Sequence, residues 1–161
     1  MPKLAILVPY RDRKEHLGQF LPGIKAYFSP EYMKEKNISG LEIHVCEQDN
    51  NQPFNKGRLI NAGFLLSRQN NDYFCIHDVD YIPIAADYSR STRPSRLIWE
   101  GLRKNENYDE FFGAVVLLNK ADFVQANGFS NEYWGWGFED TDLALRLKAV
   151  KKSLRQKRWG F

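Results

Sequence analysis

Apolar runs that end at polar or turn-forming residues alternate with segments of helical periodicity along the first half of the chain. An apolar run of β-forming residues at 3–10 predicts a strand that is buried on both faces, and two further strands are predicted at 41–48 and 72–80. Apolar side chains recur at helical spacing over 17–28 and again over 58–68, which predicts two packed helices. Pro22 lies inside the first of these segments and predicts a kink or a break there.

The second half of the chain is less regular. Its pattern predicts loops over 85–109 with one short element at 97–102, a strand at 111–119, a short helix at 120–128 and a final amphipathic helix with Leu143, Leu147 and Val150 on its apolar face. Strands that alternate with helices predict an α/β fold with a mostly parallel central sheet flanked by helices. In such folds, ligands bind beyond the carboxyl ends of the strands.

Size and composition narrow the class of protein. With 161 residues, of which 43% are hydrophobic, the chain can bury one core, and we expect a single domain over 1–161. A net charge of +3 is too small to indicate a nucleic-acid-binding protein. Cys46 and Cys75 each lie in an apolar run, which argues against a disulfide framework and favours a reducing compartment. The sequence shows no leader peptide and no apolar stretch of ~20 residues, so we expect a cytoplasmic protein without a transmembrane segment.

A basic run lies near the end of the sequence. Seven Lys and Arg residues occur between Arg146 and Arg158 without a single acidic residue. Such a run attracts phosphates or an anionic membrane surface, or it is simply the solvated and fraying end of the last helix. The sequence leaves both interpretations open.

Two carboxylates end the third predicted strand. Asp78 and Asp80 would project from the same face if the strand continued through them. Adjacent carboxylates repel one another unless a cation lies nearby, and their oxygens suit Mg²⁺ or Mn²⁺, which could hold the diphosphate of a nucleotide. The short D-x-D pattern also occurs at ordinary polar strand ends, so the surrounding residues must decide between the two interpretations.

Cations and an aromatic ring follow two other predicted strands. Arg11 and Arg13 come directly after the first strand, where they would reach a phosphate bound at the same edge of the sheet. Phe54 offers a stacking surface, and Lys56 and Arg58 stand at a helix start, where the helix dipole disfavours cations unless an anion compensates. Each residue alone is equally typical of surface charge, but together they predict a nucleotide pocket.

The stretch YWGWGFEDTD combines aromatic residues and glycines with acids. Two glycines flank Trp136 and free the backbone around it, which would let the indole cover a ligand as an enzyme lid does. Glu139 and Asp140 follow at a helix N-terminus, where the dipole favours ionised carboxylates, and an ionised Asp is a competent general base. The alternative is that Trp134 and Trp136 are core aromatics beside acids that merely suit the dipole.

Taken in order, four stretches resemble the motifs of the β-1,4-galactosyltransferase family, glycosyltransferase family seven. The family pattern is a PFRNR-like loop, FNRAKLLN, DVDLIP and WGWGGEDDD, and the chain has PYRDR, FNKGRLIN, DVDYIP and WGWGFEDTD. The resemblance covers about residues 4–150, and its last motif is highly specific. It implies a GT-A type nucleotide-sugar-binding fold. It also implies an inverting transfer of a sugar, usually galactose, from a UDP donor to a hydroxyl group of an acceptor saccharide.

The resemblance also implies roles for individual residues. The donor would be bound by Pro9, Tyr10, Arg11, Arg13, Phe54, Lys56, Asp78, Val79, Asp80 and Trp136, with Phe54 and Lys56 at the uridine. Asp80 would be the ligand of Mn²⁺, or of Mg²⁺ in its place. The acceptor would be bound by Phe138, Glu139, Asp140 and Thr141, and Asp140 would be the catalytic base that takes the proton of the attacking hydroxyl.

Three positions depart from the family pattern. Thr141 stands where the family usually has a second acceptor-binding Asp, and Phe111 falls near the position that tunes galactose against N-acetylgalactosamine. Family members complete the metal site with a His after the WGWG helix, whereas His16, His44 and His77 all precede it. We expect His77 to be a structural strand residue and not a replacement ligand.

These departures leave an alternative open. The chain could be a minimal or truncated member that lacks the metal-ligand strand of the family, or one that completes its site by oligomerisation. It could also be a catalytically incomplete module that binds nucleotide or glycan without turnover. A phosphoryl-transfer enzyme is a third reading, but it lacks a Gly-rich phosphate loop and leaves the WGWG stretch unexplained.

Overall fold

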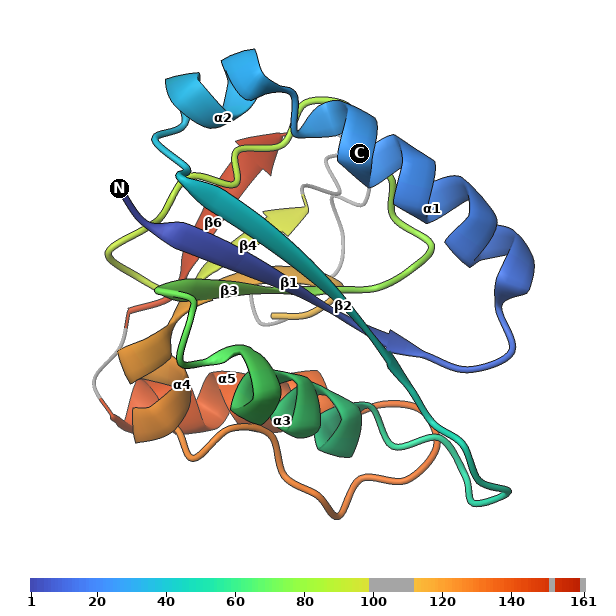
Figure 1. Ribbon diagram of the computed structural model, residues 1–161. Coiled ribbons are helices and arrows are strands. Elements are labelled where there is room, and N and C mark those ends of the chain that lie inside the picture. Colours follow the sequence, from blue (N-terminus) through green and yellow to red (C-terminus); the bar gives the residue numbers. More distant parts are fainter. Residues whose placement is uncertain (99–111, 151–152, 160–161) are drawn as a thin grey trace.

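A mixed sheet forms the centre of the computed structural model, which describes residues 1–98, 112–150 and 153–159 (Figure 1). Its strands are β1 (Lys3–Tyr10), β2 (Gly40–Glu47), β3 (Tyr73–His77), β4 (Ser95–Ile98), β5 (Val115–Asn119) and β6 (Arg155–Trp159), in the order β2-β1-β3-β5-β4-β6. β1 is parallel to β2 and β3, and β4 is parallel to β6, whereas β5 is antiparallel to both of its neighbours. Three of the five pairings are therefore parallel, which confirms the α/β fold class with a mostly parallel sheet.

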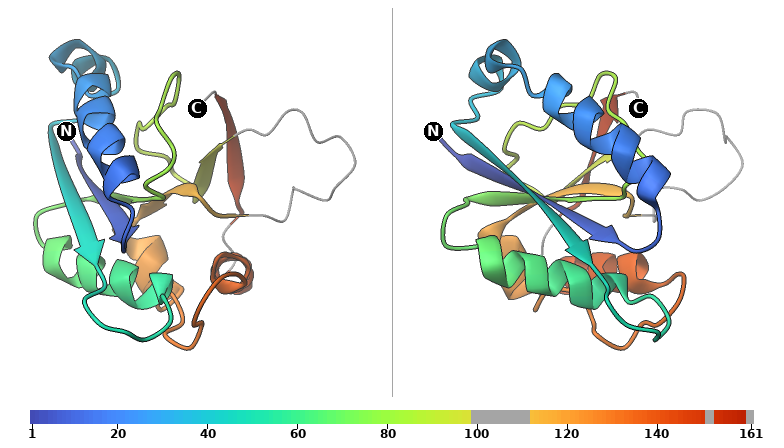
Figure 2. Two further views of the ribbon diagram at one scale, coloured as in Figure 1. Left: turned by 90° about the vertical axis from the view of Figure 1, so that its right-hand side faces the viewer. Right: turned by 45° about the vertical axis from the view of Figure 1, so that its right-hand side comes forward.

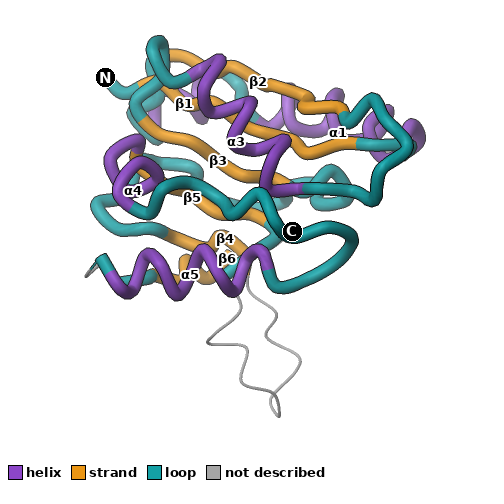
Figure 3. The backbone as a smooth tube through the Cα atoms, turned by 90° about the horizontal axis from the view of Figure 1, so that it is seen from below, coloured by secondary structure: helices purple, strands orange, loops and turns teal. Residues whose placement is uncertain are grey.

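Helices cover both faces of the sheet (Figures 1 and 2). One face carries α1 (Lys14–Tyr27) and α2 (Pro30–Glu35), and the other carries α3 (Lys56–Ser67), α4 (Lys120–Gln125) and α5 (Glu139–Ala149). Figure 3 shows the second layer from below, with α3, α4 and α5 in front of the strands. No helix in the described parts of the chain is long and apolar enough to cross a membrane.

The alternation of side chains along β1 explains the two layers, because successive residues of a strand point to opposite faces. One buried cluster contains Leu4, Ile6 and Val8 together with Phe20 and Ile24 of α1. The other contains Ala5 and Leu7 together with Ile60 and Phe64 of α3. Each fully buried aliphatic or aromatic side chain contributes roughly 1.5–3 kcal/mol relative to an exposed one, so these clusters fix both helices on the sheet.

Four predictions need correction or a narrower statement. Pro22 does not break α1, which is continuous from Lys14 to Tyr27, because Phe20 and Ile24 on either side of it are fully buried against the sheet. The third strand ends at His77 and not at 80. The short element expected at 97–102 begins earlier, as β4, and the rest of it lies outside the described residues, as does Phe111.

The fourth correction concerns the basic run. It does not simply extend α5 as a fraying end, because α5 ends at Ala149 and Arg155–Trp159 forms β6, which pairs with β4. β6 lies at the end of the observed strand order. Edge strands commonly carry Lys and Arg, which blunt pairing with other chains, so a strand of this composition suits an edge position.

The fold brings the ends of the parallel strands to one side of the molecule. β1, β2 and β3 run in the same direction, so their carboxyl ends and the segments that follow them lie at a common edge. These segments carry the PYRDR loop after β1, the loop before α3, and the DVD turn after β3. The edge is therefore the place where the sequence predicts a ligand.

Candidate active site

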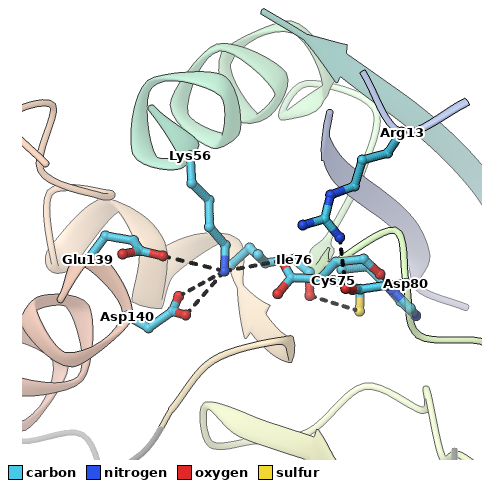
Figure 4. A network of polar contacts seen from close by, with 9 residues as sticks. Arg13, Lys56, Cys75, Ile76, Asp80, Glu139 and Asp140 are labelled. Atoms are coloured by element: carbon cyan, nitrogen blue, oxygen red, sulfur yellow. Dashed lines mark hydrogen bonds and ion pairs between the residues drawn. The ribbon is translucent and has the colours of Figure 1, made fainter. Parts of the chain in front are cut away.

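A buried lysine joins the two acidic segments of the chain. Lys56 is the first residue of α3, and its Nζ lies 3.1 Å from an oxygen of Asp78, 3.1 Å from one of Asp140 and 3.7 Å from one of Glu139. Figure 4 shows the ammonium group pointing between Glu139 and Asp140. Lys56 is only 9% exposed. The DVD turn after β3 and the first turn of α5 therefore meet at a single cation.

The electrostatics of this cluster follow from burial and mutual charge. Burial alone would lower the pKa of Lys56, but the charges of Asp78, Asp140 and Glu139 outweigh it and raise that pKa, so the lysine stays protonated. Burial raises the pKa of Asp140 to about 6, while Lys56 opposes the shift and the neighbouring carboxylates add to it. Burial likewise raises the pKa of Asp78. Asp140 is thus a carboxylate that changes charge near neutral pH.

The N-termini of α3 and α5 meet at this cluster. A cation at the start of α3 is unfavourable for the helix dipole, and the first turn of α3 has no acid of its own. The three carboxylates around Lys56 supply the missing negative charge, which the sequence led us to expect from a bound phosphate. At the start of α5, the dipole favours Glu139 and Asp140 in their ionised forms.

Asp78 and Asp80 do not share a strand face. The strand ends before them, and Asp78 turns inward to Lys56 while Asp80 lies at the surface, 3.0 Å from a guanidinium nitrogen of Arg13. Val79, between them, is buried. Figure 4 shows Arg13 reaching from the loop after β1 toward Asp80. Each carboxylate of the pair therefore has its own cation, and this is how two adjacent acids are tolerated.

His77 is a structural residue, which confirms the expectation from the sequence. It is fully buried at the end of β3, with Nδ1 2.9 Å from the carbonyl oxygen of Asp78 and Nε2 2.9 Å from the hydroxyl of Tyr88. Since a carbonyl only accepts, Nδ1 carries the proton and Nε2 accepts from Tyr88. Burial lowers the pKa of His77 to about 4, so the ring is neutral and holds the backbone of the DVD turn.

The proposed donor side is formed by the loops after β1 and β2. Pro9 and Tyr10 are buried at the end of β1. Arg11 lies over the ring of Phe54 at 5.5 Å and donates a hydrogen bond to the carbonyl of Gln52. This arrangement places a cation and an aromatic face next to one another at the strand ends, as the sequence analysis predicts.

Gln48 is a residue of this region that the sequence analysis missed. It is 8% exposed, its Oε1 accepts from the backbone N–H of Asn55, and its Nε2 donates to the carbonyls of Gln52 and Pro53. The side chain therefore folds the loop that carries Phe54. The signal in the sequence was a polar residue directly after a strand. At such a position the side chain can be buried and donate hydrogen bonds to the carbonyl groups of the next loop.

The residues from Glu132 to Phe138 form an exposed aromatic segment, here called the flap. Trp136 is 100% exposed and Phe138 is 77% exposed, so the alternative that the tryptophans are core aromatics is wrong for Trp136. Gly135 and Gly137 have φ angles of +87° and +102°, which side chains rarely adopt. The backbone on both sides of Trp136 thus has a conformation that depends on glycine. Thr141, after the flap, is exposed on the first turn of α5.

The residues present can hold a divalent cation only together with a substrate. Among the described residues, no group of three or more His, Cys, Asp and Glu side chains is arranged to bind a metal. Asp80 has a carboxylate that is 40% exposed beside Arg13. A single hard oxygen ligand suits Mg²⁺ or Mn²⁺ where the phosphates of a nucleotide and water supply the other positions. The oxygen ligands at this position are therefore compatible with a metal ion that binds together with a nucleoside diphosphate.

Family models match nearly the whole chain. A model described as the N-terminal region of glycosyl transferase group 7 matches residues 1–90, and a model described as the N-terminal domain of galactosyltransferase matches residues 93–159. The chain is 37% identical to "Beta-1,4-galactosyltransferase 7" of Drosophila melanogaster over 150 residues, which are 91% of this chain and 45% of that protein. It is 32% identical to "Xylosylprotein 4-beta-galactosyltransferase" of Caenorhabditis elegans, over 94% of this chain and 52% of that protein. The chain thus spans about half the length of these relatives.

Solved structures show the same fold. The catalytic domain of Drosophila β-1,4-galactosyltransferase 7 in complex with xylobiose superimposes with a TM-score of 0.82 at 34% identity, over 97% of this chain and 65% of that chain. A variant of the same enzyme, in complex with manganese, UDP-Gal and xylobiose, matches equally well. The motifs, the family models and the fold agree, and the chain belongs to the β-1,4-galactosyltransferase family, glycosyltransferase family seven.

Proposed function

We propose that this protein is an inverting glycosyltransferase that moves a sugar, galactose in the first instance, from a UDP donor to a hydroxyl group of an acceptor saccharide. Its relatives are named β-1,4-galactosyltransferases, and a similar structure holds manganese, UDP-Gal and xylobiose. The observation that carries the proposal is the meeting of Asp78 with Glu139 and Asp140 at Lys56. The exposed Trp136 lies shortly before Glu139 in the chain. The FNKGRLIN and WGWGFEDTD motifs thus meet at one cluster, where Lys56 and Asp140 are 84 positions apart in the chain.

On the donor side, the chain offers cations for the diphosphate and an aromatic surface for the base. Arg11 and Arg13 would neutralise the phosphates, and Phe54 would stack on the uracil, supported by the buried Pro9 and Tyr10. Val79 would line the pocket through its backbone. Trp136 would cover the diphosphate and the sugar when the flap closes, and so exclude water.

Asp80 is the residue that would hold Mn²⁺, or Mg²⁺ in its place. Bound there, the ion would supply positive charge that stabilises the UDP leaving group. Asp80 is paired with Arg13, so its carboxylate already lies beside a cation. That guanidinium would turn to the phosphates when the donor binds. Arg13 would then pair with the diphosphate, and the metal ion would replace it beside the carboxylate of Asp80.

On the acceptor side, the base would be Asp140, with Phe138, Glu139 and Thr141 beside it. The oxygen of the acceptor hydroxyl forms a bond to the anomeric carbon, and Asp140 accepts the proton of that hydroxyl. The bond from that carbon to the diphosphate oxygen breaks on the opposite face, and UDP leaves with the electron pair. Lys56 would keep Asp140 ionised before the reaction and would lie beneath the acceptor and not at the uridine, which its contact with Asp140 supports.

The function is tested by product formation. We expect UDP and a new glycoside in equal amounts when the protein is incubated with UDP-galactose, Mn²⁺ and a panel of acceptor sugars that includes xylobiose. The alternative, a module without turnover, draws support from the lack of a three-ligand metal group among the described residues. Binding of UDP with no release of UDP from UDP-galactose under any acceptor would establish the module instead. The cytoplasmic location stays a prediction of the sequence.

Asp80→Asn tests the metal assignment. Since Asp80 is the proposed protein ligand, we expect the variant to lose at least about tenfold in UDP affinity with Mn²⁺ present, or ~1.4 kcal/mol, and little with Mn²⁺ absent. Calorimetric titration measures both. Asp12→Asn removes the same charge from the neighbouring loop and is the control. Equal Mn²⁺-dependent UDP affinity in wild type and Asp80→Asn would remove Asp80 from the site.

The pH dependence of transfer tests Asp140. A base must be ionised, and the pKa of Asp140 is raised to about 6, so activity is present above that pH and lost as the pH falls through it. We expect kcat/KM to fall about tenfold per pH unit below this value and to be level above it, up to the next ionisation. A profile that is level down to about pH 4.5 would show that no such base acts in the free enzyme.

A further inference from the structure

The first turns of α3 hold the chain that leads into the flap. Residues 128–131 precede the flap and are called the root. The side chain of Asn61 donates to the carbonyl of Phe129 at 2.8 Å and accepts from its N–H at 2.9 Å. Asn55 donates to the carbonyl of Asn131 at 2.8 Å. A Cβ on Gly57 would lie 2.4 Å from the carbonyl oxygen of Ser130, so the two backbones are in direct contact. The root is thus fixed to α3.

Arg58 contacts both the root and the flap. Its Nε donates to the carbonyl of Asn131 at 3.1 Å, and its guanidinium carbon lies 4.5 Å from the centre of the Trp134 ring. The next residue of the flap, Gly135, donates its N–H to the carbonyl of Phe54 at 2.7 Å. Trp134 and Gly135 are therefore held while Trp136, directly after them, is fully exposed.

We propose that Arg58 is a positioning residue that holds the flap with Trp136 exposed and so sets how readily the flap closes over a donor. The inference rests on the proposed function, in which Trp136 must leave its exposed position to cover the diphosphate and the sugar of the donor. Movement of the indole turns the chain around Gly135, so it competes with the stacking of Arg58 on Trp134. The equilibrium between the two positions then depends on that stacking and on the bond to Asn131.

A different role for Arg58 predicts the opposite effect. A cation at the start of α3 could bind a phosphate of the donor directly, in which case its removal weakens donor binding. In the structure the guanidinium is instead over the indole, and its Nε is engaged by a root carbonyl. If Arg58 holds the flap open, its removal raises the fraction of protein that is ready to close and tightens donor binding.

The sign of the change in UDP affinity decides between these roles. An exposed cation–π contact and one hydrogen bond together correspond to about tenfold in an equilibrium constant. We expect Arg58→Ala to bind UDP with Mn²⁺ about three- to tenfold more tightly in calorimetry, and Arg58→Lys to lie between it and wild type, because an ammonium lacks the planar stack. Arg68→Ala, at the other end of α3, should match wild type. Weaker or unchanged binding by Arg58→Ala overturns the proposal.

A second readout needs no ligand. With 5-fluorotryptophan in place of tryptophan, the ¹⁹F resonance of Trp136 is assigned by its loss in Trp136→Phe. We expect it to shift or change width in Arg58→Ala and to stay as in wild type in Arg68→Ala, since Arg58 is linked to Trp136 only through the flap. An unchanged Trp136 resonance overturns the proposal even where wild type binds UDP. If wild type binds no UDP, the proposed function fails, and this comparison alone decides the role of Arg58.

Discussion

Asp140→Asn is expected to lower kcat for sugar transfer about 10²- to 10⁴-fold while leaving UDP affinity within about twofold. The amide has the shape of the carboxylate but accepts no proton from the attacking hydroxyl. Donor binding is spared because the proposed donor contacts, apart from Trp136 on the flap, lie on the loops after β1, β2 and β3. Initial rates with UDP-galactose and a saturating acceptor, together with UDP titration of the same preparation, separate the two quantities.

Asp142→Asn is the matched control for this experiment. Asp142 belongs to the same first turn of α5, but its carboxylate is turned to Arg146 at 2.6 Å and not to Lys56. The control removes the same charge from the same helix, and we expect its kcat to stay within about threefold of wild type. Unchanged transfer by Asp140→Asn, or an equal loss in both variants, would contradict the role of Asp140 as the base.

Lys56→Met is expected to have the largest effect on stability. It removes the cation between three carboxylates and leaves the buried Asp140 and the partly buried Asp78 without it. Breaking a buried ion pair in this way costs about 3–5 kcal/mol in the free energy of unfolding. Urea denaturation measures the loss. Lys36→Met is the control, because Lys36 pairs with an exposed Glu35 and lies over the ring of Tyr32 near the surface, and we expect it to cost less than about 1 kcal/mol.

The pH dependence of this loss has a definite sign. The pKa of Lys56 in the folded state is raised above 10.5, so the stability that its own protonation contributes is fully present below that value. The charge of Lys56 is therefore the same at about pH 5 and about pH 8, and any change between them comes from the carboxylates. In the variant, the pKa values of Asp78 and Asp140 rise further, and protonation relieves their repulsion as the pH falls. The deficit relative to wild type should therefore be smaller near pH 5 than near pH 8. A deficit that grows toward pH 5 would show that the carboxylates are not the cause.

The framework of the fold could be predicted from the sequence because it depends on local patterns. β1, β2 and α3 follow from apolar runs and helical spacing, since one face or both faces of each element must be buried. The exposure of Trp136 agrees with one of the two interpretations that the sequence left open, the one based on the backbone freedom of the flanking glycines. These features need no knowledge of distant parts of the chain.

Features that depend on distant partners could not be predicted in the same way. Lys56 was assigned to the uridine, but its ammonium is surrounded by carboxylates, one of them 84 positions away. Only the fold shows that the helix dipole at the start of α3 is compensated by acids of the chain itself. β6 was missed for a similar reason, because a basic run becomes a strand only when β4 offers a pairing edge.

A crystal structure of the protein with Mn²⁺ and UDP tests the central claim most directly, because the claim is that one edge of the sheet holds donor and base together. The anomalous signal of manganese should lie at the carboxylate of Asp80, with the diphosphate beside Arg13 and the uracil on Phe54, while Asp140 stays next to Lys56 and faces the space left for an acceptor. An ion that binds away from Asp80, or a nucleotide bound on another face of the molecule, would contradict it.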